Sequence, residues 1–245
     1  MIRFYAPDIA ATLTLPESDS QHSVRVLRMR EGDSLEVVDG KGTLYTCTLV
    51  DAHPKHAAVE IEGSRDLPLF WDHGIIIAVA PTKNMDRMEW MTEKLTEMGV
   101  NRIIPLLCRH SERKEIKTER LEKIAVSAMK QSLKAWLPEI SPMTPVKEVL
   151  RGFKDYRRLI CYCDESTPRT YIGHTYRPDE PIIVMIGPEG DFSPEEVELA
   201  VAEGWEPVTL GDTRLRTETA AIAACQTIHT VDLLGDRQKR WPPEK

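Results

Sequence analysis

The sequence lacks any apolar run of the length that a membrane-spanning helix needs, which is about 20 residues. Its start, MIRFYAPDIA, also lacks the charged and then apolar order of a signal peptide. We therefore expect a cytoplasmic protein that does not enter a membrane. The 245 residues suit one large domain, or a small domain followed by a medium one.

Cysteine is scarce and is not arranged for metal binding. The five cysteines include no Cys-x-x-Cys pair, and Cys161 and Cys163 alternate within an apolar strand pattern. This usage favours small buried side chains in a reducing compartment. Of the seven histidines, only His53 and His56 lie close together, in a predicted turn without a carboxylate or cysteine pattern around them. We expect no metal site.

Positive charge is in deficit, since the formal net charge is −7. This balance argues weakly against a nucleic-acid partner, but the distribution of charge matters more than its sum. Arginines gather at residues 25–30, and a second basic stretch contains Arg109, Arg113, Lys114, Lys117, Arg120, Lys123, Lys130 and Lys134. Two interpretations stay open: a local basic face that holds nucleic acid, or an ordinary solvated helix surface.

Short strands are predicted for residues 1 to about 70, with turn residues such as Asp39-Gly40 between them. These strands are Ser34–Asp39, Leu44–Ala52 and Ala57–Glu62, and one helix is expected at Ser20–Leu27. The pattern indicates a small barrel, a shape that often presents one face to RNA. The segment Ser64–His73, with a proline and bulky aromatic residues, is the expected domain boundary.

From residue 75 onward, predicted strands and helices alternate. Ile75–Ala80 is a continuous apolar run, typical of a parallel strand that is buried on both faces. Asp86 is expected to cap a helix that ends at Gly99. The other predicted strands are Arg102–Cys108, Leu159–Cys163, Ile182–Ile186 and Pro207–Leu210, and the other helices are Thr118–Trp136, Pro194–Glu203 and Thr217–Leu234. Such alternation indicates a doubly wound α/β sheet, whose ligands bind beyond the carboxyl ends of the strands.

The strand Ile182–Ile186 runs directly into a glycine turn, Gly187-Pro188-Glu189-Gly190. The next helix is expected to begin with a capping box formed by Ser193 and Glu196. The glycines could serve only a tight turn, but a nucleotide-type ligand also binds at such a place. Carboxylates at positions 189, 191, 195 and 196 would repel a pyrophosphate. They tolerate an adenosine ligand with a cationic centre and no phosphate, which describes S-adenosylmethionine.

A second polar loop follows the strand Pro207–Leu210 and begins at Gly211. It enters a helix with alanines at positions 220, 221, 223 and 224. Small side chains let backbones approach closely, which suggests a crowded core or a tight subunit contact. Arg216 and Glu218 are the polar side chains best placed to project from this loop into a pocket.

Together these two segments resemble the knotted, SPOUT-type methyltransferases. More narrowly, they resemble the bacterial enzymes that methylate N3 of a uridine in 16S ribosomal RNA. The motifs are Gly187-Pro188-Glu189-Gly190 and, after Leu210-Gly211, Leu215-Arg216-Thr217-Glu218-Thr219-Ala220. The resemblance covers nearly the whole chain, because further motifs follow in the family's order: His22–Arg28, Gly32-Asp33, Asp39–Gly42, Asp86-Arg87, Glu97–Val100 and Ser111–Arg113.

The resemblance implies a PUA-like RNA-binding barrel at residues 1–70 and a SPOUT methyltransferase domain at residues 74–245 with a C-terminal trefoil knot. It also implies S-adenosylmethionine as methyl donor, 16S ribosomal RNA of the small subunit as partner, and a homodimer with the donor pocket beside the subunit interface. The expected cofactor-binding residues are Met185, Ile186, Gly187, Pro188, Glu189, Gly190, Leu210, Gly211, Leu215, Arg216, Thr219 and Ala220. The expected RNA-binding residues are Arg25, Arg28, Arg113, Arg120 and Lys134.

Two positions depart from the family pattern. Asp191 stands where the family usually has a second glycine, although Asp tolerates left-handed backbone better than most residues. Leu133-Lys134 stands where the family tends to have Gly-Arg. Lys134 keeps a cation at that place but not a bidentate guanidinium.

Arg216 and Glu218 are the expected catalytic residues. Arg216 could stabilise negative charge on a uracil carbonyl oxygen, and Glu218 could accept the N3 proton or orient Arg216. Because base pairing hides N3, the target base must be unpaired or extruded. Two other functions stay open: ribose 2′-O-methylation of RNA by the same fold, and a non-catalytic RNA-binding assembly factor.

Overall fold

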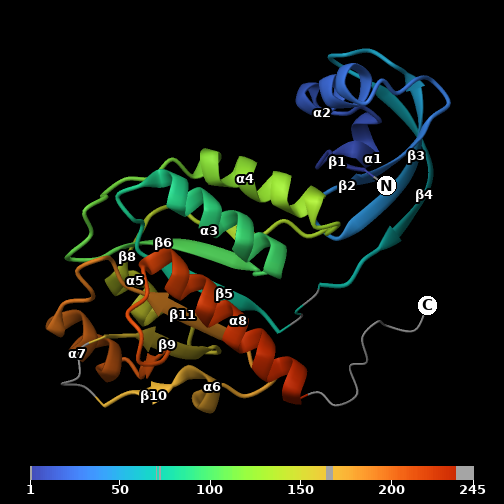
Figure 1. Cartoon of the computed structure of the whole chain (residues 1–245). Coiled ribbons are helices and arrows are strands. Elements are labelled where there is room, and N and C mark those ends of the chain that lie inside the picture. The colour runs from blue at the N-terminus through green and yellow to red at the C-terminus, as the bar shows by residue number, and fades with distance from the viewer. Residues whose placement is uncertain (1, 70, 72, 164–167, 236–245) are drawn as a thin grey trace. The chain divides into compact units, whose positions relative to one another are not determined.

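The computed structural model describes residues 2–69, 71, 73–163 and 168–235. The chain divides into two compact units (Figure 1). The N-terminal unit comprises residues 1–70 and 125–137, and the C-terminal unit comprises residues 71–124 and 138–245. The contiguous domain bounds 1–70 and 74–245 stay a prediction. Among the described helices, none combines the length and the apolar composition needed to cross a bilayer.

A four-stranded sheet in the order β1–β2–β3–β4 forms the centre of the N-terminal unit. The strands are β1 (Arg3–Tyr5), β2 (Ser34–Val38), β3 (Thr43–Asp51) and β4 (Ala58–Asp66). β1 pairs with β2 in parallel, whereas the β2–β3 and β3–β4 pairs are antiparallel. β2 and β3 lie close to their predicted places, but β4 extends into the segment expected as the domain boundary. Closure of this sheet into a barrel stays a prediction.

The segment Ser20–Leu27 is helical as predicted, but it is not a single α-helix, and the expectation of only one helix in this region is wrong. A short helix, α2 (Glu17–Gln21), follows α1 (Ile9–Thr12) and leads into a π-helical turn at His22–Val26. The wider turn arises because the N–H of Leu27 donates to the carbonyl of His22, five residues back.

The helix predicted at Thr118–Trp136 ends five residues early, since α4 spans Thr118–Gln131. Leu133 adopts a left-handed backbone with φ 56°. Its N–H donates to the Lys130 carbonyl at 3.2 Å, and the N–H of Lys134 donates to the Met129 carbonyl at 3.0 Å. This pair of bonds is a Schellman motif, which terminates a helix. Glycine adopts such a left-handed φ without strain, whereas leucine seldom occupies it.

Parallel strands make up the large sheet of the C-terminal unit, in the order β10–β12–β9–β11–β5–β6–β7, with β8 paired to β6. Every strand pair that the structure describes in this sheet is parallel. The strands are β5 (Ile75–Val79), β6 (Arg102–Leu107), β7 (Glu139–Ile140), β8 (Thr144–Pro145), β9 (Arg157–Cys161), β10 (Thr170–Tyr171), β11 (Ile182–Ile186) and β12 (Glu206–Thr209). The helices are α3 (Met85–Met98), the first part of α4, α5 (Val146–Arg151), α6 (Ile172–Thr175), α7 (Pro194–Ala202) and α8 (Thr217–Gly235).

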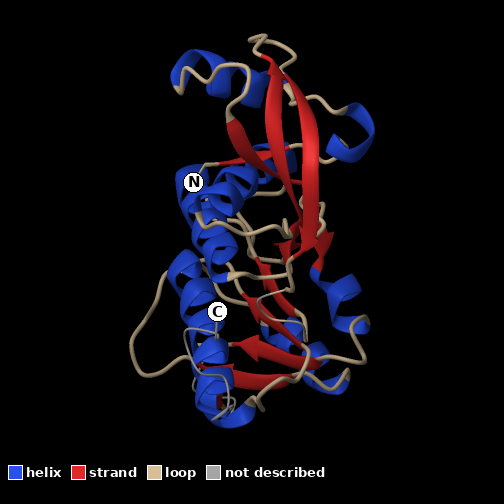
Figure 2. Cartoon of the chain, turned by 90° about the vertical axis from the view of Figure 1, so that its right-hand side faces the viewer, coloured by secondary structure: helices blue, strands red, loops and turns tan. Residues whose placement is uncertain are grey.

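Helices cover both faces of this sheet, which confirms the predicted α/β fold (Figure 2). On β5, Ile75, Ile77 and Val79 join one core together with apolar side chains of α3 and α8. The residues between them, Ile76 and Ala78, join a second core with side chains of α5 and α7. A strand that is buried on both faces has no polar alternation, and this explains the continuous apolar runs of β5 and β11. The trefoil knot stays a prediction.

The helix after β5 begins earlier than predicted. Its N-cap is Asn84, whose side-chain oxygen accepts the N–H of Asp86 at 2.9 Å, so Asp86 lies inside α3. Asn serves as an N-cap as well as Asp does, and sequence alone does not choose between two neighbouring candidates. The predicted end is confirmed, because Gly99 terminates α3 with φ 87°.

A buried polar network holds the far end of α8. Asp232 has 0% exposure, and its Oδ1 accepts the Tyr176 hydroxyl at 2.9 Å and the Asp179 N–H at 3.0 Å. Nε2 of His73 lies 3.4 Å from Oδ2 of Asp232. Burial alone would raise the pKa of Asp232, but hydrogen bonds from His73, the Asp179 backbone and Tyr176 outweigh it and hold the pKa below its ordinary value.

Asp232→Asn is expected to lower the free energy of unfolding at pH 7 by about 1–3 kcal/mol, because buried donors lose a charged acceptor. A carboxyl with a lowered folded-state pKa contributes stability above its unfolded pKa, which is about 4, and this contribution is lost as the pH falls through the folded value. Urea unfolding at pH 7 and pH 3 should therefore show a smaller difference between variant and wild type at pH 3. An equal difference at both pH values would contradict this role of the charge.

Candidate functional site

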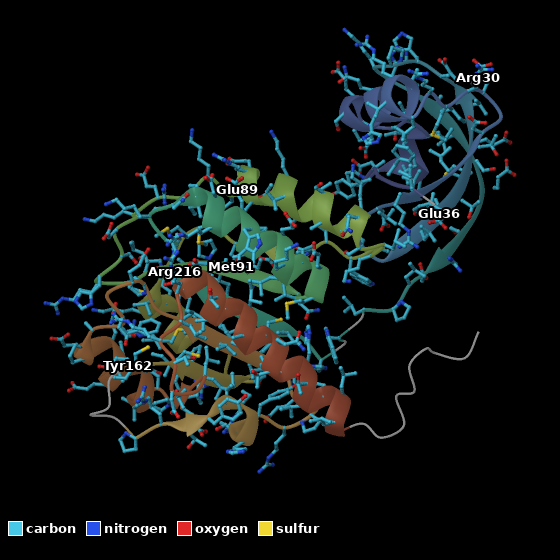
Figure 3. All side chains as sticks on the ribbon, in the orientation of Figure 1. Arg30, Glu36, Glu89, Met91, Tyr162 and Arg216 are labelled. Atoms are coloured by element: carbon cyan, nitrogen blue, oxygen red, sulfur yellow. The ribbon has the colours of Figure 1, made fainter. Side chains whose placement is uncertain are left out.

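The loops that follow β11, β9 and β12 leave the large sheet side by side, because β9 lies between β11 and β12 in the strand order. In parallel strands the carboxyl ends share one edge, where α/β proteins bind their ligands. The glycine turn follows β11 and the Gly211 loop follows β12. Arg216 precedes α8 and Tyr162 follows β9. In Figure 3 both are labelled on the left-hand side of the C-terminal unit.

Close packing surrounds the glycine that opens the first turn. A Cβ on Gly187 would lie 3.1 Å from Cδ2 of Phe192 and 3.2 Å from Oδ1 of Asp191. The N–H of Asp191 donates to the Pro188 carbonyl at 2.9 Å and closes the turn. This packing agrees with a tight turn, and the turn leaves Glu189 and Gly190 exposed at the edge of the sheet.

The predicted capping box is present at the start of α7. The Ser193 hydroxyl accepts the Glu196 N–H at 3.3 Å, and a Glu196 oxygen accepts the Ser193 N–H at 2.9 Å. The other Glu196 oxygen accepts the Arg109 N–H at 2.8 Å. Hydrogen bonds from its own backbone and from Ser193, together with the Arg109 guanidinium, lower the pKa of Glu195. The helix start thus already carries acceptors of its own, and a phosphate would meet two carboxylates there.

The second loop is tied to the first at the start of α8. The Thr217 hydroxyl donates to the Gly187 carbonyl at 3.2 Å. Within the loop, Thr209 Oγ1 donates to the Gly211 carbonyl and accepts its N–H, at 3.0 and 3.2 Å. Gly211 has φ 119°, a backbone conformation that L-amino acids rarely adopt. The two segments expected to bind the cofactor therefore lie next to one another.

The expected cofactor residues differ in what they can present to a ligand. The side chains of Met185 and Ile186 are buried in the cores on opposite faces of the sheet, so only their backbone atoms can contact a ligand. Leu210, Leu215 and Ala220 are half-buried, whereas Gly211, Arg216 and Thr219 are exposed. Pro188 is buried within the turn.

Glu218 is the most unusual side chain at this edge. It is only 6% exposed, and no hydrogen-bond partner for its Oε2 occurs among the described residues. Its Oε1 lies 3.7 Å from Nε of Arg87, on the first turn of α3. The ion pair of Glu218 is therefore with Arg87 rather than with Arg216, and the expectation that Glu218 orients Arg216 finds no contact in the described structure. A buried carboxylate oxygen without a hydrogen-bond partner destabilises the folded protein. Such atoms often occur at ligand sites, where the ligand supplies the missing donor.

The expected RNA-binding residues separate into two groups. In the N-terminal unit, Arg25 and Arg28 are exposed and Lys134 is half-buried. In the C-terminal unit, Arg113 donates to the carbonyls of Thr82 and Lys83 at 3.2 and 2.6 Å, and so fixes the loop after β5. Arg120 pairs with Glu89, labelled on α3 in Figure 3, and lies 3.8 Å from Asp86.

Sequence reasoning missed Arg87 and the end of β9 as parts of this site. Arg87 was noticed only as part of a motif, and its partner lies more than a hundred residues away. Tyr162 and Cys163 border the site because of the strand order, which no local pattern encodes. Within the described ranges, no three His, Cys, Asp or Glu side chains converge where a metal ion could bind.

Comparison with known proteins matches residues 71–229 to a family described as the RNA methyltransferase domain. The chain belongs to this RNA methyltransferase family. Residues 15–62 match the RNA methyltransferase PUA domain. The PUA match covers the main part of the N-terminal unit, and the methyltransferase match covers the main part of the C-terminal unit.

Relatives of the methyltransferase family match over almost the whole chain. Ribosomal RNA small subunit methyltransferase E of Synechocystis sp. is 32% identical over 91% of this chain and 74% of that protein. A crystal structure described as a "probable rRNA-methyltransferase from Porphyromonas gingivalis" is 46% identical, covers 96% of this chain and 99% of its own, and has a TM-score of 0.92. Ribosomal RNA small subunit methyltransferase E of Neisseria gonorrhoeae, solved with bound S-adenosyl methionine, is 29% identical, covers 94% and 98%, and has a TM-score of 0.78.

The Arg87–Glu218 pair can be tested through stability. Arg87→Met should lower the free energy of unfolding by about 2 kcal/mol, because it leaves a buried carboxylate without its cation. Glu218→Gln should have little effect, and the double variant should recover most of the loss. Chemical denaturation of the four proteins completes the cycle. If the double variant is no more stable than Arg87→Met, the two side chains do not interact.

Proposed function

We propose that this protein transfers a methyl group from S-adenosylmethionine to N3 of a uridine in 16S ribosomal RNA. Membership of the RNA methyltransferase family and the relatives named for the small ribosomal subunit support rRNA methylation. The choice of uridine N3 rests on the sequence motifs at Gly187–Gly190 and Leu215–Ala220.

The residues at the sheet edge fit S-adenosylmethionine better than a phosphate-bearing cofactor. The carboxylates of Glu195 and Glu196 occupy the start of α7, where a phosphate would otherwise be stabilised. The turn Gly187–Gly190 and the loop Leu210–Leu215 would hold the donor, largely through backbone groups, because their glycines leave the peptide groups accessible. When bound, the sulfonium supplies an activated methyl group, so the protein contributes mainly orientation and proton removal.

Glu218 is the proposed acceptor of the N3 proton. Its Oε2 is buried and lacks a partner among the described residues, beside the Thr217–Gly187 contact that joins the two loops. A carboxylate in this state can accept a proton from a donor that enters the site, such as the N3–H of uracil. Arg87 keeps one oxygen of Glu218 paired, and the exposed Arg216 can stabilise negative charge on a uracil carbonyl oxygen.

Homodimer formation belongs to the same proposal. Large apolar side chains are exposed on the neighbouring helices α3 and α8: Trp90 is 47% exposed, Leu233 53% and Leu234 74%. Exposed apolar side chains of this size favour burial against a partner, and a second copy of the chain would cover them. The cytoplasmic location and the trefoil knot remain predictions from the sequence.

The decisive experiment measures the methylated nucleosides of 16S RNA by mass spectrometry in a strain that lacks this gene. We expect N3-methyluridine to be absent and to return with the wild-type gene. Glu218→Gln should restore it poorly, because loss of a general base slows the reaction by about 10²–10⁴-fold. Glu198→Gln, which replaces an exposed carboxylate on α7, serves as the matched control and should restore it fully.

Two results would overturn the proposal. Unchanged N3-methyluridine in the deletion strain would exclude the uridine-N3 assignment, and loss of a ribose 2′-O-methyl group instead would assign the other chemistry. Restoration of ribosome assembly by a variant that does not bind S-adenosylmethionine would indicate a non-catalytic assembly factor.

A further inference from the structure

Asp191 holds a backbone conformation that favours glycine. Its φ is 60°, in the left-handed region that side chains with a Cβ seldom occupy. Glycine would adopt this φ without strain. With aspartate at this position, contacts of the side chain have to offset the backbone strain.

The carboxylate of Asp191 makes such contacts across two loops. Oδ1 accepts the N–H of Phe192 at 2.8 Å, and Oδ2 accepts the N–H of Cys163 at 2.9 Å. Phe192 is buried in the core beneath α7, whereas Cys163 follows β9. One side chain therefore joins the glycine turn to the end of the neighbouring strand.

The place of this contact in the sheet explains its importance. Backbone pairing between β9 and β11 ends at Cys161 and Ile186. Beyond that point the segments that follow β9 and β11 are no longer paired as strands. Asp191 there provides an acceptor for the Cys163 N–H. From the other side, Nδ1 of His110 lies 3.2 Å from the Gly190 carbonyl and 3.1 Å from the Asp191 carbonyl. The turn is thus fixed from the loops after both β9 and β6.

We propose that Asp191 is a positioning residue for the methyl-donor site, which holds the end of β9 against the glycine turn. It keeps the two loops in one geometry before the donor arrives, so that less order has to be created on binding. This role rests on the proposed function for the identity of the donor, but the Asp191–Cys163 contact itself does not.

Two substitutions at Asp191 and one elsewhere test the role in the full-length protein. Asp191→Gly removes both side-chain hydrogen bonds and keeps the left-handed backbone available. Asp191→Asn keeps one acceptor oxygen and a residue that tolerates this backbone. Leu133→Gly is the matched control, because Leu133 also has a left-handed φ, of 56°, and its exposed side chain has no hydrogen-bonding atom.

Calorimetric titration with S-adenosylmethionine and amide hydrogen exchange at Tyr162–Cys163 are the two measurements. We expect Asp191→Gly to weaken donor binding about tenfold, equivalent to about 1.4 kcal/mol, and to speed exchange of the Cys163 amide. Asp191→Asn should lie between this variant and the wild type in both measurements. Leu133→Gly should match the wild type, and thermal unfolding will show that all the variants are folded.

Wild-type affinity and wild-type exchange in Asp191→Gly would overturn the proposal. So would faster exchange without any loss of affinity, because the contact would then be structural only. If the wild-type protein does not bind S-adenosylmethionine at all, the proposed function fails. In that case the exchange measurement still decides whether Asp191 holds the end of β9.

Discussion

The position of β9 between β11 and β12 is the constraint on which the site depends. It places three loops at one edge of the sheet, although they are separated along the chain by helices and other strands. The Thr217–Gly187 hydrogen bond then joins the segments that follow β12 and β11, and the Asp191–Cys163 hydrogen bond joins those that follow β11 and β9. Arg87 from α3 completes the edge by pairing with the buried Glu218.

Much of this arrangement could be predicted from local sequence. The strands β5 and β11 are buried on both faces, so their residues are apolar without interruption and can be recognised directly. The capping box of Ser193 and Glu196 depends on residues three positions apart, and the structure contains it as predicted. The glycine turn and the Gly211 loop were also located correctly, because both follow strands and precede helices.

The features that were missed depend on contacts between distant residues. The partner of Glu218 is Arg87 on another helix, and the role of Asp191 appears only when β9 lies beside β11. The end of α4 was placed too late because a leucine, rather than a glycine, takes the left-handed position there. The N-cap of α3 was assigned to Asp86 instead of Asn84 because both residues are suitable. In each case the sequence allows several local solutions, and packing selects one.

Protection of Cys163 from alkylation tests directly whether the donor binds where the three loops meet. Cys163 is exposed, whereas Cys47, Cys108 and Cys225 are buried and Cys161 is half-buried. The rate of maleimide labelling at Cys163 would be followed by peptide mass spectrometry, with and without saturating S-adenosylmethionine, and Cys163→Ser would give the background. The account predicts slower labelling when the donor is bound. An unchanged rate, in a protein shown by calorimetry to be saturated, would place the donor elsewhere and contradict the account.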